Sequence, residues 1–263
     1  MNVVFYIIIF IIGLLLGDFY VTSARRMKKG KKIFSIHSYC SNCGEKLKIL
    51  EKIPILSYLF LKGKCKHCNK KIKIQYILGE ILAGILFLLI AVMLDINATS
   101  ITSFIFIILY FSYIILAMIM DKEARNIPQK LLTYGIIISL IYIVYLCIID
   151  RTAIYKNAIY LLIMVILLLI DTINTKKLAQ ESYVIELLTT LLIMLIFTEE
   201  ITCILTIIGT LITIALYILI NKISKIKSKG KKDKNKFSSR IRIILIMGIL
   251  NIITFLLLIT ICR

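Results

Sequence analysis

Four cysteines in a polar segment form two pairs with the same spacing. Cys40 and Cys43 form the first C-x2-C pair, and Cys65 and Cys68 form the second. Such a pair lets two thiolates converge on one ion from a single tight turn, and two pairs complete the tetrahedral sulfur site that Zn2+ prefers. The 21-residue linker leaves room for two small hairpins. The spacing therefore predicts a structural Zn2+ site with these four cysteines as ligands.

The residues around the pairs agree with a metal site. Gly44 and Asn69 directly follow the second cysteine of each pair, where a chain that reverses around an ion often needs a positive φ. We expect a short strand after each pair, and we expect His37 and His67 to be exposed, because four thiolates already fill the coordination shell. Disulfides or a redox thiol site are the alternative, which fits poorly with the reducing cytoplasm where charge places this segment.

Acidic residues at membrane depth or at its edge are the second set of candidates for chemistry, because each costs several kcal/mol to hold there without a reason. Asp121 ends a long apolar run and is followed seven residues later by Pro128, which can begin the next helix. By position alone, Asp121 also fits a helix-end acid that faces water. Seven of the fourteen acids lie at membrane depth or at its edge: Asp18, Glu80, Asp121, Glu123, Asp171, Glu181 and Glu186.

A second acid near Asp121 would allow peptide-bond hydrolysis. Two carboxyl groups that share one proton polarise a water for attack, with one group as base and the other as acid. Asp171 ends the fifth apolar run and Glu181 precedes the sixth, and both fall on the same side of the membrane as Asp121 in the topology below. We expect Asp121 as one carboxyl of this pair and either Asp171 or Glu181 as the other.

The elements that must position these residues are transmembrane helices. The chain of 263 residues is 60% hydrophobic, with a mean hydropathy of +0.96, two prolines and no tryptophan, which excludes an ordinary soluble domain. Apolar runs near the ~20 residues that cross a bilayer occur at 3–22, 76–94, 101–120, 131–149, 153–170, 183–198, 201–220 and 243–262. The bilayer forces such runs to be helical. We predict an all-α polytopic membrane protein of about eight helices, with a small zinc-ribbon-like cytoplasmic domain between the first two.

The distribution of charge predicts the orientation. The net charge is +19, and thirty of the thirty-three Lys and Arg residues lie in segments 23–75, 121–130, 171–182 and 221–242. If the first helix runs from outside to inside, all four segments are cytoplasmic, which is the positive-inside pattern. The basic stretches at 25–32 and 222–242 are expected to contact anionic lipids, at about 1 kcal/mol per cation. They lack the interleaved aromatics of a nucleic-acid platform, so we expect no nucleic acid partner.

These patterns divide the chain into three parts. We expect a first transmembrane helix at 1–22, a cytoplasmic zinc-binding domain with four cysteine ligands at 23–75 and a seven-helix membrane-embedded peptidase domain at 76–263. No basic n-region precedes the first apolar run and no small-residue cleavage site follows it, so we expect that helix to be retained. A domain of about fifty residues buries too little core to be secure alone, so a structural metal suits it.

The region around the cysteines resembles a known family. The run Ile53-Pro54-Ile55-Leu56-Ser57-Tyr58-Leu59 between the pairs, and Gln75-Tyr76-x3-Glu80 after them, resemble the N-terminal region of bacterial type IV prepilin peptidases. Asp121 and Pro128 similarly match the D-x6-P pattern of that family's first catalytic aspartate. Through the eight-helix order, the resemblance is expected to extend over nearly the whole chain.

The resemblance implies a function. Members are membrane-embedded aspartic endopeptidases of the bacterial cytoplasmic membrane, and they remove the short basic leader of prepilins or pseudopilins on the cytoplasmic side. They also methylate the new N-terminus with S-adenosylmethionine, for which the sequence shows no Gly-rich cofactor loop. By this resemblance Asp121 is a catalytic carboxyl, and the domain carrying Cys40, Cys43, Cys65 and Cys68 supports or docks the substrate.

The chain departs from the family at the second catalytic aspartate. The family motif G-x-G-D-x-K-L is absent, and its place is taken by Gln180-Glu181 by position or by Asp171 by residue type. The sequence therefore predicts a divergent member. The alternative is a catalytically degenerate homologue that acts as a non-enzymatic scaffold in pilus or type II secretion assembly. A metal-ion transporter would need intramembrane Cys or His ligands along a path, and no such constellation appears.

Overall fold

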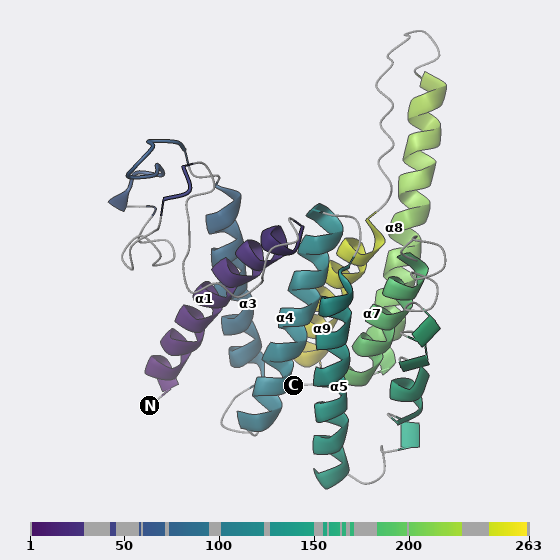
Figure 1. Cartoon of the computed structure of the whole chain (residues 1–263). Coiled ribbons are helices and arrows are strands. Elements are labelled where there is room, and N and C mark those ends of the chain that lie inside the picture. Colours follow the sequence, from purple (N-terminus) through teal and green to yellow (C-terminus); the bar gives the residue numbers. More distant parts are fainter. Residues whose placement is uncertain are drawn as a thin grey trace. The chain divides into compact units, whose positions relative to one another are not determined.

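The fold was described from a computed structural model of the chain, which is predominantly helical (Figure 1). Residues described by the structure are 2–28, 43–45, 58, 60–71, 74–94, 101–123, 127–149, 155–156, 158–163, 165–166, 169–170, 183–198, 200–227 and 242–261. The chain divides into two compact units, Met1–Ile119 and Met120–Arg263, which we call unit 1 and unit 2.

Seven helices have defined bounds. They are α1 (Asn2–Lys28), α3 (Gln75–Met93), α4 (Ile101–Glu123), α5 (Gln129–Ile149), α7 (Tyr183–Phe197), α8 (Glu200–Lys227) and α9 (Ile243–Ile261). Each coincides with one of the predicted apolar spans. The remaining span, 153–170, is helical at every residue that the structure describes there. The all-α prediction is therefore confirmed for the described residues.

Four of these helices are long and apolar enough to cross a membrane. They are the segments Val3–Ala24, Ile101–Lys122, Gln129–Ile149 and Ile243–Ile261, and three shorter apolar helices occur at Ile77–Met93, Ile185–Phe197 and Glu200–Leu216. Large apolar side chains are exposed along α1, α5 and α8, as expected for surfaces that face lipid. The chain is an integral membrane protein.

The strands predicted after the cysteine pairs lie largely outside the described residues. Within residues 60–71, the structure has an isolated antiparallel bridge between Lys64 and Lys71. A metal knuckle needs only a chain reversal, so a single bridge is enough to close it.

In unit 1, α1 packs closely against α3, and the two helices lie side by side in Figure 1. Small residues allow the close approach: a Cβ added at Gly17 would lie 2.7 Å from the Glu80 Cα, and one at Gly13 would lie 2.7 Å from the Gly84 Cα. Glycine at such crossings lets helix backbones come into contact in membranes, where packing replaces the hydrophobic effect as the driving force. This packing fixes the two helices that flank the cysteine segment.

In unit 2, α7 packs against α5, α8 and α9, and α8 packs against α9. The α8–α9 interface contains buried polar groups: the amide of Asn251 donates to the Thr206 Oγ1 at 3.4 Å, and the hydroxyls of Thr206 and Thr254 lie 3.2 Å apart. The rings of Tyr142 and Phe197 stack between α5 and α7, with centroids 4.6 Å apart. Interhelical hydrogen bonds and ring contacts thus hold this bundle together.

Candidate functional site

The sulfur atoms of Cys43, Cys65 and Cys68 converge in unit 1. All three Sγ atoms lie within 4.8 Å of one another. A tetrahedral Zn2+ site with Zn–S bonds of about 2.3 Å places its sulfurs about 3.8 Å apart, so the observed cluster fits a metal of this kind. Cys65 is buried, whereas Cys43 is exposed. The fourth predicted ligand, Cys40, lies outside the described residues.

The backbone around these cysteines shows the predicted conformation. Gly44 has φ +72° and Asn69 has φ +55°, so the positive-φ prediction is confirmed at both positions. The Asn69 N–H donates to the Cys65 carbonyl at 2.9 Å, and the Cys65 N–H donates to the Lys70 carbonyl at 3.0 Å. These bonds close a loop that presents both sulfurs of the pair to one point. His67 is exposed, as predicted.

A turn that the sequence analysis did not single out precedes Cys65. Gly63 has φ +69°, and its N–H donates to the Tyr58 carbonyl at 2.9 Å. A Cβ at Gly63 would lie 2.7 Å from the Tyr58 ring, so this position excludes a side chain for two independent reasons. The Lys62-Gly63 pair just before a cysteine is the local signal that indicates such a turn.

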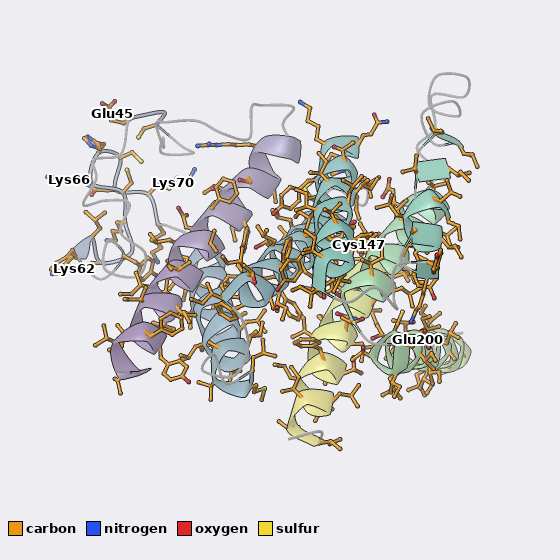
Figure 2. All side chains as sticks on the ribbon, turned by 90° about the horizontal axis from the view of Figure 1, so that it is seen from below. Glu45, Lys62, Lys66, Lys70, Cys147 and Glu200 are labelled. Carbon is orange, nitrogen blue, oxygen red and sulfur yellow. The ribbon has the colours of Figure 1, made fainter. Side chains whose placement is uncertain are left out.

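The surface of this segment is basic. Three lysines are exposed on the loops around the cysteines: Lys62, Lys66 and Lys70. Glu45 follows Cys43 by two residues, and Figure 2 labels all four side chains. We call residues 58–71 together with Cys43 the cysteine knuckle.

Asp121 is buried near the end of α4, in unit 2. Its side chain is 2% exposed, and its Oδ2 accepts a hydrogen bond from the Leu245 N–H at 2.9 Å. Leu245 lies in the first turn of α9, where backbone N–H groups have no partner within the helix. The positive end of the helix dipole also favours a carboxylate there. The structure therefore contradicts the alternative of a helix-end acid that faces water.

Glu186 is a second buried acid of unit 2. It lies in the first turn of α7, it is 3% exposed, and its Oε2 accepts a hydrogen bond from the Ile127 N–H at 2.7 Å. The sequence analysis counted it among seven acids but favoured others. Its position inside the span 183–198, rather than at an end, was the available signal, because acids inside a membrane span are rarely without a role.

These two carboxylates connect four helix ends. Asp121 joins the end of α4 to the start of α9, and Glu186 joins the first turn of α7 to Ile127, just before α5. Because α7 packs against α9, the contacts form a closed circuit. We call Asp121, Ile127, Glu186 and Leu245 the carboxylate ring. Its acids have the chemistry needed to orient or deprotonate a water.

The other predicted members of the acid pair, Asp171 and Glu181, lie outside the described residues.

Comparison with known proteins gives a consistent picture. Residues 11–94, which include the second part of α1, the cysteine knuckle and α3, match the family described as the bacterial peptidase A24 N-terminal domain. The chain is 35% identical to the prepilin leader peptidase/N-methyltransferase of Bacillus subtilis over 127 residues, which are 48% of this chain and 50% of the relative. No solved structure matches.

Two further relatives carry similar names. The prepilin leader peptidase/N-methyltransferase of Vibrio cholerae is 33% identical over 153 residues, covering 54% of this chain and 58% of the relative. A type 4 prepilin-like proteins leader peptide-processing enzyme of Escherichia coli is 29% identical over 100 residues, covering 38% and 35%. The chain thus spans about half the length of the first two of these relatives and about a third of the last.

Proposed function

We propose the function of this chain from one premise: its N-terminal region, residues 11–94, is a bacterial peptidase A24 N-terminal domain, and the chain is related to prepilin leader peptidases. On this basis the protein is a membrane-embedded aspartic endopeptidase that removes the short basic leader from prepilin or pseudopilin substrates. The observation that carries the proposal is the burial of Asp121, which is held by the first turn of α9 instead of facing water.

In the proposed reaction one carboxyl takes a proton from a water molecule as that water attacks the scissile carbonyl. The other carboxyl protonates the amine that leaves when the C–N bond breaks. Asp121 supplies one of these groups, and Asp171 or Glu181 supplies the other. The Leu245 N–H bond supports this role, because it orients the Asp121 carboxyl.

The cysteine knuckle has a structural role in this proposal. Cys40, Cys43, Cys65 and Cys68 hold Zn2+, and the folded knuckle supports or docks the substrate. The sulfur cluster supports this role because its spacing suits a tetrahedral ion. Methyl transfer from S-adenosylmethionine to the new N-terminus enters the proposal through the relatives' names alone.

The proposal includes the orientation of the chain. The protein lies in the bacterial cytoplasmic membrane, with segment 23–75 in the cytoplasm between a first helix at 1–22 and a membrane-embedded domain at 76–263. Its basic segments contact anionic lipids. The support is the concentration of Lys and Arg in alternate loops.

A second candidate is a non-enzymatic scaffold of pilus or type II secretion assembly. The observation that favours it is the absence of the G-x-G-D motif: no glycine occurs between Gly135 and Gly209. The sequence in the place of the family's second-aspartate motif therefore differs in this chain.

Leader removal distinguishes the two candidates. Membranes that carry the protein are incubated with a prepilin, and cleavage is followed by the mobility shift of the product. We expect Asp121→Asn to lower cleavage by about 10²- to 10⁴-fold, the usual range for loss of a general acid or base. Asp233→Asn, in a basic polar segment, serves as the control and should leave cleavage unchanged.

The same assay assigns the second carboxyl by comparison of Asp171→Asn with Glu181→Gln. If wild-type protein leaves a panel of prepilins uncut where a related peptidase cuts them, the scaffold candidate is correct.

A further inference from the structure

The Ile127 N–H, just before α5, is a backbone donor that the helix cannot use. The Pro128 carbonyl accepts from the N–H groups of Leu131 at 2.8 Å and Leu132 at 3.4 Å, which closes the first turn of α5. Pro128 itself has no N–H. The Ile127 N–H therefore lies outside the helix, and it donates to the Glu186 Oε2 at 2.7 Å.

This hydrogen bond is buried on both sides. Ile127 is 2% exposed and Glu186 is 3% exposed, so water does not replace the contact when it is lost. The contact is thus a firm attachment of the α5 start to α7.

The α7 end of the attachment is rigid. The Glu186 carbonyl accepts hydrogen bonds from the Thr189 Oγ1 at 2.9 Å and the Thr190 Oγ1 at 2.8 Å. Both threonines are fully buried. These bonds hold the first turn of α7, so the carboxylate of Glu186 extends from a fixed backbone.

The bonds of Asp121 and Glu186 attach two helix ends that lie close together in the chain, the end of α4 and the start of α5. Asp121 and Ile127 are separated by five residues, and each is attached to a different helix of one packed pair, α9 and α7. The Asp121 carboxyl is therefore attached to α9, and the Ile127 N–H is attached to α7.

We propose that Glu186 is a positioning residue: by holding the Ile127 N–H, it fixes the start of α5 against α7 and thereby helps to position the Asp121 carboxyl. This inference rests on the proposed peptidase function for its effect on activity, but its effect on structure is independent of that function.

Three substitutions at Glu186 separate positioning from proton transfer. Glu186→Gln keeps an acceptor oxygen for the Ile127 N–H. Glu186→Ala removes the acceptor, and Glu186→Asp shortens the side chain by one methylene, so that its oxygens lie farther from this N–H. We expect Glu186→Gln to retain prepilin cleavage, with kcat/KM within about threefold of wild type. Glu186→Ala should lower kcat/KM by about 10²-fold, the loss that a misplacement of about 1 Å can cause, and Glu186→Asp should fall between.

Glu200→Ala is the matched control. Glu200 is also a first-turn glutamate, at the start of α8, but its side chain is 57% exposed and it pairs with the exposed Lys156. Figure 2 labels it on that helix. Loss of this carboxylate should leave kcat/KM unchanged, since it holds no buried backbone donor.

Hydrogen exchange of the full-length protein in lipid nanodiscs supplies the readout that does not depend on activity. Glu186→Ala should speed exchange of the Ile127 amide and also of the Leu245 amide, which reports the position of Asp121, while Glu186→Gln leaves both slow. Faster exchange at Ile127 alone would overturn the inference, because the effect would then stop at the α5 start. Loss of cleavage in Glu186→Gln with both amides still protected would also overturn it, since the carboxyl itself would then take part in the chemistry. An inactive wild type would contradict the proposed function, and the two amides would still decide the inference.

Discussion

The cysteine knuckle and the carboxylate ring are both small constellations of polar groups, but they are assembled over very different distances in the sequence. The knuckle is closed by backbone bonds between residues no more than five apart, such as the one from Cys65 to Lys70. The ring is closed by bonds across 124 residues, from Leu245 to Asp121, and 59 residues, from Ile127 to Glu186. Local spacing therefore predicts the first constellation, whereas the second depends on how the helices pack.

The two constellations should also fail in different ways. The knuckle has little core of its own, so its stability depends on the ion and on turns that tolerate little change. The ring lies within a packed bundle, so loss of one contact should weaken unit 2 without unfolding it.

The largest effect is expected from Cys65→Ser. Structural Zn2+ binding contributes about 10–16 kcal/mol in small zinc-binding peptides, and loss of one thiolate removes most of the specific affinity. We expect the purified variant to lose stoichiometric metal and residues 58–71 to become sensitive to protease. Cys147→Ser, a half-buried cysteine on α5 labelled in Figure 2, is the control and should retain the metal. If purified Cys65→Ser still contained stoichiometric zinc, the cysteine knuckle would not depend on an ion held by Cys65.

The next effect is expected from Gly63→Ala. The alanine must adopt φ near +69° and its Cβ would lie 2.7 Å from the Tyr58 ring, so backbone strain and overpacking combine to about 2–4 kcal/mol. Gly44→Ala has a similar φ of +72° with nothing within 4 Å, so it should cost only about 1–2 kcal/mol. Competition of a chelator for the metal measures the loss of metal affinity in both variants. Equal losses in Gly63→Ala and Gly44→Ala would show that the contact with the Tyr58 ring is unimportant.

A smaller effect is expected from Asp121→Ala. It leaves the Leu245 N–H buried without its acceptor, which costs about 1–3 kcal/mol of unfolding free energy in unit 2. Asp121→Asn keeps an acceptor oxygen and should lose less than half as much unfolding free energy, although it should lower the proposed cleavage by about 10²- to 10⁴-fold. Denaturant titration of both variants gives the comparison. If Asn and Ala destabilise unit 2 equally, the bond to Leu245 does not hold α9.

The smallest effect is expected from Glu200→Gln. Its partner Lys156 is 45% exposed, and an exposed ion pair contributes about 0–1 kcal/mol, less in salt. We expect the unfolding free energy to change by no more than about 0.5 kcal/mol at roughly 0.15 M salt. A loss as large as that of Asp121→Ala would show that exposed and buried carboxylates contribute alike in unit 2.

The sequence predicted the helices better than their ends. All seven bounded helices fall on predicted spans, but α1 continues to Lys28 and α8 to Lys227, six or seven residues beyond the expected ends. Hydropathy detects where the apolar run stops, whereas Lys and Arg remain good helix formers and extend their side chains toward water. A hydropathy criterion therefore does not detect the basic last turns of these helices.

The acids show the limit of prediction from sequence most clearly. Asp121 and Glu186 were both among the acids at membrane depth or at its edge, but the expected topology and the family resemblance selected Asp171 and Glu181 as partners for Asp121. Glu186 emerged as a partner of the segment after Asp121 only through its bond to Ile127. Which acid faces which helix end depends on helix rotation and packing, and hydropathy carries no information on rotation when a helix is apolar on every side.

The sequence by itself determined the all-helical membrane class, the paired cysteines and the positive φ at Gly44 and Asn69. Each of these follows from composition or from neighbours a few residues apart, and so from local chemistry. Only the tertiary structure decided that Asp121 is buried against α9 and that Glu186 holds the start of α5. The reason is that a buried carboxylate needs a donor, and in unit 2 the available donors are the N–H groups at helix starts that packing brings from far along the chain.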